Sequence, residues 1–487
     1  MKRVPLNRRN FIKTTTISST VLILPNSKVF GANERIGVGV VGCGGRGTGH
    51  VGWAGKSGGT VVAVCDPDPG RARNAANKAG GEVVKKYADM RELFEDKDVD
   101  ATVMATPNHW HALGTVWACQ AGKDVYVEKP ASHNIWEGRK MVEAARKYKR
   151  IVQVGTQQRS DPALIETKHM LDKKELGEVQ WVHALWYARR GSIGKTEGPQ
   201  PIPDDVDYDA WCGPRDKVPL RRKKFHYDWH WFWDYGNGDM GNRVIHNIDD
   251  IHHVLRINDD VPTRMMAVGG RFQYNDDANT PNTEVIIMDW KVPIIFSSRN
   301  MPYVDPKSGK GTGTASYKRF GKGLRFANLI KCENGFITVA RGGGNVYDNE
   351  GNKIKKISGD GGGSHMKNYF DAVKSRNHED LNADVEQSHL GCVMLHTGNN
   401  SLRVGKPADP NKITEACSNT EEGKHHWEDT MEHLRSNGVD LKVEKATLGP
   451  WLTYDKKTER FTGDHAEEAN KLVKESYRDP YVIPENV

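Results

Sequence analysis

The 487-residue sequence has few cysteines, and nothing in their spacing links them. The seven cysteines are scattered, odd in number and never arranged as C-x-x-C. This pattern excludes a disulfide framework or a cysteine-rich zinc site as the organising feature of the fold. It is typical of a protein that folds in a reducing compartment.

The sequence also lacks a long apolar run and a large net charge. The apolar stretch at 17–24 is short and rich in Thr and Ser, and no cysteine follows it as a lipid anchor. We therefore expect no stable membrane anchor. The formal charge is +7, but six basic residues and no acid lie within 1–32, which leaves about +1 for the rest. That balance predicts no nucleic-acid partner.

The first residues carry an export pattern. Residues 7–13 read Asn-Arg-Arg-Asn-Phe-Ile-Lys, and an apolar stretch follows them. Residues 29–31, Val-Phe-Gly, could form the site at which a signal peptidase removes the leader. This arrangement is typical of a twin-arginine signal peptide, which we assign to 1–32. The twin-arginine translocase carries folded proteins, so we expect a periplasmic protein that is loaded with any cofactor before export.

Residues 33–155 alternate short β-branched stretches with amphipathic ones. This alternation predicts an α/β domain with a doubly wound parallel sheet, the Rossmann arrangement. The expected strands are 36–41, 60–65, 101–105, 124–127 and 151–154, and the expected helices are 71–79, 111–121 and 135–148.

The pattern of predicted elements changes after residue 155, where strand-like stretches follow one another without helices between them. We expect residues 156–405 to form an α+β domain with an open, mainly antiparallel sheet. Its expected strands are 179–187, 263–274, 283–290, 293–298, 324–332 and 335–340, and its expected helices are 365–375 and 385–402. Residues 406–487 are polar with few apolar anchors, and we expect an extension that wraps the body or contacts another subunit.

A glycine-rich turn follows the first expected strand. Gly42 permits a tight turn, Gly44 lets main-chain amides approach a pyrophosphate, and Gly47 allows close packing of helix on strand. Asp66 ends the next strand, where its carboxylate would accept hydrogen bonds from ribose hydroxyls and repel a 2′-phosphate. The motif therefore predicts NAD, with NADP less favoured but left open by Arg46 and Arg71. The residues assigned here to the cofactor are Gly42, Gly44, Gly45, Arg46, Gly47 and Asp66.

Two further loops follow strand ends at the same edge of the sheet. Ligands of open α/β sheets bind outside the carboxyl ends of the strands, so both loops should line the cofactor cleft. A lysine in the second loop can hold an alcohol oxygen and stabilise the alkoxide that develops as hydride leaves; a surface salt bridge is the alternative interpretation of the Glu-Lys pair. The residues involved are Thr106, Pro107, Asn108 and His111, then Glu128, Lys129 and Pro130.

These motifs, in this order and spacing, resemble the Gfo/Idh/MocA oxidoreductase family over roughly residues 35–402. The resemblance implies a Rossmann domain, a second domain whose open sheet covers the nicotinamide, and subunits that pair into homo-oligomers. It also implies that Lys129 is catalytic. The family's second motif, an Asp followed four residues later by His, matches His246, but Asn242 stands in place of the acid.

His246 also makes chemical sense, because its ordinary pKa suits a general base. Asn242 can bind a sugar hydroxyl but cannot act as a carboxylate, so Asp239 or Asp249 would have to replace the acid. A packing histidine remains the alternative. Several His and Asp residues around 246–253 also suggest a metal, but no H-E-x-x-H or two-His-one-carboxylate spacing stands out, and we assign none.

Residues 225–234 are unusually aromatic. Aromatic faces stack on the apolar faces of sugar rings while neighbouring polar groups bind the hydroxyls, so this stretch suits carbohydrate, although core or interface is the more common meaning. The residues assigned to the substrate are Arg159, Tyr227, Trp229, Trp231, Trp233 and Asp239.

The combined pattern predicts a periplasmic, NAD-dependent sugar or glycoside oxidoreductase with tightly bound cofactor, acting for example at C3 of a glycoside. Two alternatives remain open at this stage. One is a glycoside hydrolase or lyase that uses NAD for transient oxidation and elimination. The other is a non-catalytic sugar-binding protein on a decayed dehydrogenase fold, for which Asn242 is the main support.

Overall fold

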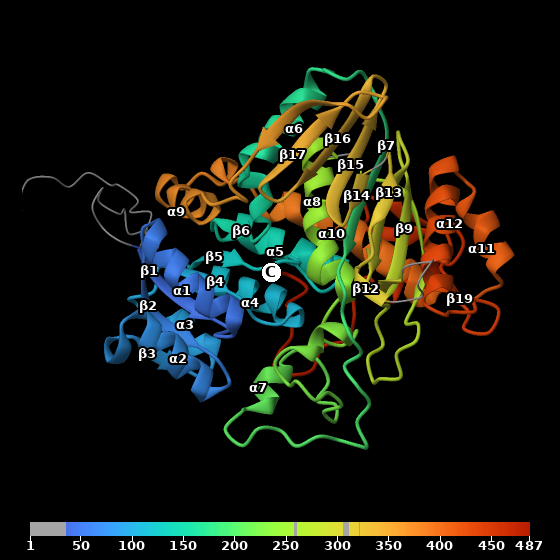
Figure 1. The fold of residues 1–487 in the computed structure, drawn as a ribbon. Helices are drawn as coiled ribbons and strands as arrows, with labels where there is room; N and C mark the ends of the chain where they lie inside the picture. Colours follow the sequence, from blue (N-terminus) through green and yellow to red (C-terminus); the bar gives the residue numbers. More distant parts are fainter. Residues whose placement is uncertain (1–35, 258–260, 305–310, 321) are drawn as a thin grey trace, which may run out of the picture. The chain divides into compact units, whose positions relative to one another are not determined.

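The computed structural model describes residues 36–257, 261–304, 311–320 and 322–487. The twin-arginine pattern and its cleavage site lie outside these residues. The described chain contains two large sheets, one near each side of the ribbon in Figure 1. No helix among the described residues is both long enough and apolar enough to cross a membrane.

The first sheet has six strands in the order β3-β2-β1-β4-β5-β6, all parallel. This confirms the Rossmann arrangement. The strand order reverses between β1 and β4, which opens a crevice at their carboxyl ends. The strands are β1 Ile36–Val41, β2 Gly59–Cys65, β3 Lys85–Tyr87, β4 Ala101–Met104, β5 Asp124–Val127 and β6 Val152–Val154.

The edge strand β3 was missed by the sequence analysis because its Lys-Lys-Tyr segment is polar and largely exposed. The helices beside this sheet start at side-chain caps that the sequence provides. Asp68 accepts hydrogen bonds from the first amides of α2, and Asn134 does so for α5. The helices are α1 Gly45–Ser57, α2 Pro69–Ala79, α3 Met90–Glu95, α4 His111–Gln120, α5 Ile135–Lys147 and α9 His365–Ser375.

The second sheet has twelve strands and is antiparallel except for the pair β7 and β10. Its main path runs β18-β17-β16-β15-β7-β10-β9-β8-β20-β19. The sheet confirms the expected mainly antiparallel second domain. The strands are β7 Val179–Tyr187, β8 Arg264–Gly270, β9 Thr283–Asp289, β10 Ile294–Arg299, β15 Phe326–Cys332, β16 Gly335–Ala340, β17 Gly343–Tyr347 and β18 Lys353–Ser358, and two short hairpins pair β11 Pro302–Val304 with β12 Gly311–Thr314 and β13 Tyr317–Arg319 with β14 Lys322–Leu324.

Alternating residues of the second sheet face two different hydrophobic clusters. On β8, Met265 and Ala267 belong to the cluster shared with the Rossmann domain, whereas Met266 and Val268 face the opposite side. The long helix α10, Val385–Val404, packs on β8, on α5 and on α8, Ile245–Val254. It therefore lies between the two sheets and joins their cores. The short helices α6 Pro162–Asp172 and α7 Tyr208–Cys212 complete this part of the chain.

The residues after 405 cover the opposite side of the second sheet. Trp427 and Leu434 of α12 are fully buried against Met266, Val268 and Ile287. This segment thus has more apolar anchors than its polar composition indicated. Its elements are β19 Lys406–Pro407, α11 Pro410–Cys417, α12 Glu421–Ser436, β20 Thr447–Leu448, β21 Leu452–Asp455, β22 Arg460–Thr462 and α13 Ala466–Asn470.

The last described residues return to the Rossmann domain. The main-chain N–H of Trp136 in α5 donates to the carbonyl of Val473 at 3.0 Å, and the Tyr477 hydroxyl donates to Glu137 at 3.0 Å. Tyr481 packs edge-on against Trp110, which follows β4. The C-terminal segment is therefore tied to both domains.

Candidate active site

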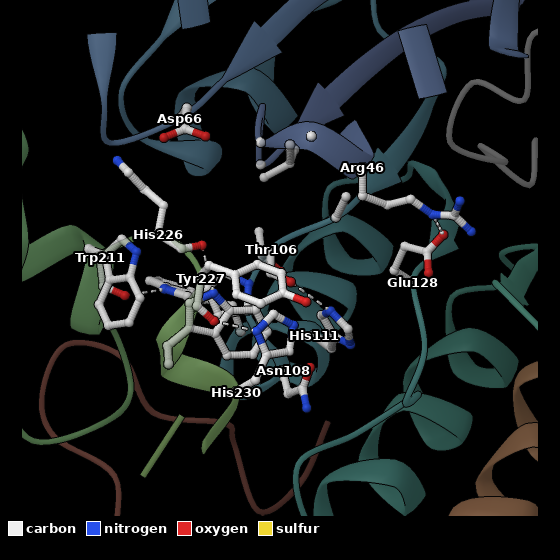
Figure 2. Close-up of a pocket in the computed structure, with 18 of the residues that line it drawn as sticks. Arg46, Asp66, Thr106, Asn108, His111, Glu128, Trp211, His226, Tyr227 and His230 are labelled. Carbon is white, nitrogen blue, oxygen red and sulfur yellow. Dashed lines mark hydrogen bonds and ion pairs between the residues drawn. The ribbon is translucent and has the colours of Figure 1, made fainter. Parts of the chain in front are cut away.

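A cavity of about 520 Å³ lies at the carboxyl ends of the parallel strands. Its walls come from the loops after β1, β2, β3, β4 and β5, from the segment 186–246 of the second domain, and from Arg341 and Tyr481. In Figure 2, Asp66 and Trp211 lie toward one side, the Arg46–Glu128 pair lies toward the other, and Tyr227 and His230 lie between them. The crevice predicted from strand order is thus a pocket to which both domains contribute.

The glycine-rich turn has the geometry of a phosphate cradle. Gly42 has a φ of 83°, and a Cβ there would lie 2.7 Å from the backbone of Ala105. A Cβ on Gly47 would lie 1.8 Å from the carbonyl oxygen of Gly42, so any side chain would push α1 off the turn. A Cβ on Gly45, in contrast, would meet nothing within 4 Å. There is therefore open space beside Gly45 at the start of α1, where a phosphate could approach the helix N-terminus.

Asp66, at the end of β2, is held in place by main-chain amides. One carboxylate oxygen accepts from the N–H of Cys43 at 2.7 Å and the other from the N–H of Asp68 at 2.9 Å. Burial raises the pKa of Asp66 to about 6, against the effect of these hydrogen bonds and of Arg71. Each oxygen keeps a second lone pair, so the ionised group can accept hydroxyl hydrogen bonds.

Arg46 and Glu128 form a pair inside the pocket wall. The Arg46 Nε donates to Glu128 at 2.6 Å, and the His50 Nε2 lies 2.9 Å from the same carboxylate oxygen. Burial alone would raise the pKa of Glu128, but Arg46 and His50 hold it well below its usual range. Glu128 is therefore a permanent anion that fixes the loop carrying Lys129.

The loop after β4 is pinned by its own side chains. Both ring nitrogens of His111 contact main-chain carbonyls, of Pro130 at 2.6 Å and of Thr106 at 3.0 Å. Asn108 donates to the side chain of Asn237 at 2.9 Å. The Thr106 hydroxyl is buried without a hydrogen-bond partner among the described residues, although it lines the pocket. His111 and Asn108 thus position the loop, and Thr106 is left for a ligand.

Lys129 reaches across from the Rossmann domain to the second domain. Its Nζ donates to the main-chain carbonyl of Asn242, in the π-helical turn Met240–Val244. Burial lowers the pKa of Lys129 to about 8, with Glu128 opposing and nearby arginines reinforcing the shift. A π-helical turn is rare and often marks a functional site. The carbonyl of Asn242, rather than its side chain, therefore positions the lysine, and Asn242 is also one of the residues that line the pocket.

His246, one helical turn beyond Asn242, also lines the pocket. Its Nδ1 is buried and has no hydrogen-bond partner among the described residues, and its ring stacks beside Trp186. Burial, followed by the charge of Lys129, lowers the pKa of His246 well below its usual range. The imidazole is therefore neutral and keeps one ring nitrogen as a proton acceptor.

Neither acid proposed to replace the missing carboxylate contacts His246. Asp249 pairs with Arg159 through two hydrogen bonds of 2.7 and 2.9 Å. Asp239 accepts from Arg190 at 3.1 Å and from Asn300. No hydrogen bond described in the structure joins His246 to a carboxylate, so an Asp–His relay is not formed here.

Of the six residues assigned to the substrate, Tyr227 and Trp229 line the pocket. Trp231 lies behind the wall, 4.4 Å below the guanidinium of Arg190. The others also lie outside it, each because another contact holds it: Arg159 with Asp249, Asp239 with Arg190, and Trp233 with Arg403. Gly47 likewise supports the turn from outside the pocket.

The structure adds site residues that the motifs did not indicate. Arg190 follows the end of β7, where its main-chain N–H donates to Asn300 at 2.9 Å. Arg243 follows Asn242, and His230 stacks on Trp229 at 3.7 Å between ring centroids. The end of a long predicted strand was the one available signal for Arg190. Further lining residues that the sequence analysis did not single out include Asp89, Trp186, Arg190, Trp211, Arg243, Arg341 and Tyr481.

The residues present fit a dinucleotide. The glycine turn leaves space at the start of α1, Asp66 is fixed for a ribose, and Thr106 has an unused hydroxyl. Within the described ranges, no three His, Cys, Asp or Glu side chains gather in a way that would hold a metal ion.

Comparison with known proteins identifies the class. Residues 36–156 match the family model described as "Oxidoreductase family, NAD-binding Rossmann fold", and residues 181–310 match the family's C-terminal alpha/beta domain. Together these matches span just over half of the chain. The protein belongs to the Gfo/Idh/MocA oxidoreductase family, and its cofactor is NAD.

Its relatives include inositol dehydrogenases. The chain is 40% identical to inositol 2-dehydrogenase 1 of Saccharopolyspora erythraea over 151 residues, which are 30% of this chain and 44% of that one. It is 35% identical to scyllo-inositol 2-dehydrogenase (NAD(+)) of Bacillus subtilis over 121 residues, 25% of this chain and 35% of that one. The chain thus spans less than half the length of the curated relatives it matches.

Solved structures show the same fold at low sequence identity. The WlbA dehydrogenase of Bordetella pertussis, in complex with NADH and UDP-GlcNAcA, has a TM-score of 0.56 at 19% identity, covering 77% of this chain and all of that one. Levoglucosan dehydrogenase, in complex with NADH and levoglucosan, has a TM-score of 0.54 at 16% identity, covering 74% and 95%.

Proposed function

We propose that the protein is an NAD-dependent dehydrogenase that oxidises a CH–OH group of a sugar, glycoside or polyol. The observation that carries this proposal is the meeting of Lys129 and His246, from different domains, in the pocket formed by the glycine turn and Asp66. Bound NAD supplies the hydride acceptor.

Different side chains of the protein have different roles around the reacting oxygen. Lys129, mostly protonated below pH 8, donates a hydrogen bond to that oxygen and stabilises its negative charge. Neutral His246 accepts the hydroxyl proton. Asn242 and the ring of Trp229 orient the substrate, and Tyr227 and His230 limit the access of water.

NAD rather than NADP is favoured by the pairing of the nearby charges. The Asp66 carboxylate would repel a 2′-phosphate. Arg46 is already paired with Glu128, and Arg71 lies 3.6 Å from Asp68. Neither arginine is therefore an uncommitted partner for an additional phosphate.

The test is to purify the full chain, add NAD and a panel of inositols, sugars and glycosides, and follow the near-ultraviolet absorbance of reduced nicotinamide. A rise with one class of compound supports the proposal and identifies that class. Release of aglycone without net reduction would instead support the redox-neutral cleavage, including transient oxidation at C3. Binding without either change would favour a sugar-binding protein.

We further propose export of the folded protein by the twin-arginine translocase to the periplasm. The Arg8–Arg9 pair supports this, together with seven cysteines that are all buried and unpaired, as expected for folding in a reducing compartment. Cell fractionation of the full chain and of an Arg8→Lys/Arg9→Lys variant tests it: the variant should accumulate in the cytoplasm. Equal distribution of both would reject the proposal.

We also propose that the protein forms homo-oligomers, as its family resemblance suggests. Light scattering on the purified chain measures the mass directly, and a monomer at micromolar concentration would reject this.

A further inference from the structure

The reacting end of the pocket carries more positive charge than the proposed oxidation of a neutral sugar requires. Lys129, Arg190, Arg243 and Arg341 all line it. Three acidic side chains line the pocket, and each has other partners. Glu128 binds Arg46 and His50, Asp66 accepts from main-chain amides, and Asp89 pairs with Arg91. Among the described residues, no ion pair joins these four cations to a carboxylate of the pocket lining.

A buried aspartate behind the wall holds two of these arginines side by side. Asp239 is only 2% exposed and lies 3.1 Å from the Arg190 Nε and 4.0 Å from the Arg243 Nε. It is fixed in turn by the side chain of Asn300. One carboxylate thus serves two guanidinium groups, which leaves the pair with a net positive charge.

The remaining contacts orient the arginines without neutralising them. Arg190 donates to the Tyr227 hydroxyl at 2.9 Å and lies over the ring of Trp231. The Nη1 of Arg243 is buried and has no hydrogen-bond partner among the described residues. A buried guanidinium nitrogen without a partner is costly unless a ligand satisfies it.

The two arginines belong to the substrate end rather than to the cofactor phosphates. Both come from the second domain, whereas the phosphate cradle is the turn before α1. Their positive charges help to lower the pKa of both Lys129 and His230, which places them near the reacting group. A ligand that reaches Lys129 therefore also meets Arg190 and Arg243.

We propose that Arg190 and Arg243 form a binding site for an anionic substituent of the substrate, so that the preferred substrate is an acidic sugar. This inference rests on the proposed function and specifies its substrate class. A planar guanidinium fork suits a carboxylate, as in a uronic acid, and a sulfate ester carries the same charge. In this arrangement the arginines hold the substituent while Lys129 and His246 address the hydroxyl that is oxidised.

The experiment compares matched ligands on the full chain with NAD bound. Isothermal titration calorimetry measures the binding of methyl glucuronide, methyl glucoside and methyl glucoside 6-sulfate, and absorbance follows reduction of the nicotinamide in parallel. We expect at least one acidic ligand to bind roughly tenfold or more tightly than the neutral one, with the advantage shrinking at high salt. Comparison of methyl glucuronide with methyl glucoside 6-sulfate shows whether the site prefers a carboxylate or a sulfate ester.

Variants assign the effect to the arginines. Arg243→Gln should remove most of the preference, and Arg243→Lys should retain part of it because the charge remains without the fork. Arg264→Gln is the matched control, since this half-exposed arginine pairs with Asp289 on β9, away from the pocket. Thermal melting checks the fold of each variant, and Arg190→Gln is used if Arg243→Gln is unstable.

The outcomes separate this inference from the proposed function. Equal binding of acidic and neutral ligands, no binding of either acidic ligand, or an unchanged preference in both Arg→Gln variants overturns the inference. Reduction of nicotinamide by neutral sugars alone would overturn it while leaving the dehydrogenase intact. Selective binding of an acidic ligand without reduction would support the anionic site and reject the dehydrogenase.

Discussion

Lys129 of the loop after β5 donates a hydrogen bond to the carbonyl of Asn242 in the π-helical turn of the second domain. The contact joins the family's lysine motif to its histidine segment without using the side chain of Asn242. The position of the amine therefore depends on the backbone of the turn. A change from acid to amide at residue 242 leaves this contact in place.

The charge of Lys129 should govern the alkaline side of the activity profile. Its pKa of about 8 means that the group loses its proton, and with it the stabilisation of the alkoxide, as pH rises through that value. We expect kcat for oxidation to fall above about pH 8. Lys129→Met should lower kcat at every pH, and Lys129→Arg, which stays charged, should lack this falling limb. Steady-state rates between pH 6 and 10 test this; a falling limb that persists in Lys129→Arg would contradict it.

Asp66 should make cofactor affinity depend on pH in the opposite direction. The folded protein holds a proton on Asp66 up to about pH 6, and hydroxyl donors favour the ionised form. We expect NAD to bind more tightly as pH rises from 5 to 7, and Asp66→Asn to weaken binding roughly tenfold at pH 7 and flatten the dependence. Fluorescence titration measures this.

The exposed Asp98, which pairs with Lys85 on the far strand β3, provides the control for that titration. Asp98→Asn should bind NAD as the unmodified protein does over the same pH range. A pH dependence that persists in Asp66→Asn would assign it to another group.

His246 should affect chemistry more than binding. His246→Gln keeps a polar side chain but removes the proton acceptor, so kcat should fall by roughly 10² to 10⁴ with little change in NAD affinity. His169→Gln, at an exposed position of α6, should retain full activity. Rapid-mixing measurements of nicotinamide reduction separate the chemical step from product release. A His246→Gln enzyme with normal single-turnover rates would identify His246 as a packing residue.

Trp427 should be a main support of the second sheet. It is fully buried in α12 against β8 and β9. Trp427→Ala should cost about 3–5 kcal/mol of unfolding free energy because it leaves a large cavity. Chemical denaturation followed by circular dichroism measures this, and Val443→Ala, at a residue 82% exposed in the same segment, is the control. A loss below about 1 kcal/mol would show that α12 contributes little to the sheet.

The cofactor-binding part of the site could be predicted from the sequence because each of its segments directly follows a strand. The turn at Gly42, the carboxylate of Asp66 and the loop of Lys129 all occupy strand ends, so strand order alone brings them together. The substrate end does not follow from such a rule. Arg190 and Arg243 are brought together through Asp239, and this depends on how the second domain packs.

The aromatic stretch illustrates the same limit. The composition of residues 225–234 predicted that they bind a ligand. The local turns instead direct some of these side chains into the pocket and others away from it. Trp229 faces the pocket, whereas Trp231 lies below Arg190 and Trp233 contacts Arg403. Which ring meets the ligand is decided by side-chain direction, and local sequence does not encode that direction.

The placement of Tyr481 in the pocket wall bears on the timing of assembly. During synthesis the phosphate cradle emerges more than four hundred residues before this tyrosine. A nascent chain can therefore form the six-stranded sheet and yet present an unfinished cavity. Because this part of the wall is present only when the C-terminal segment is docked on α5, we expect a chain without that docking to hold NAD less tightly.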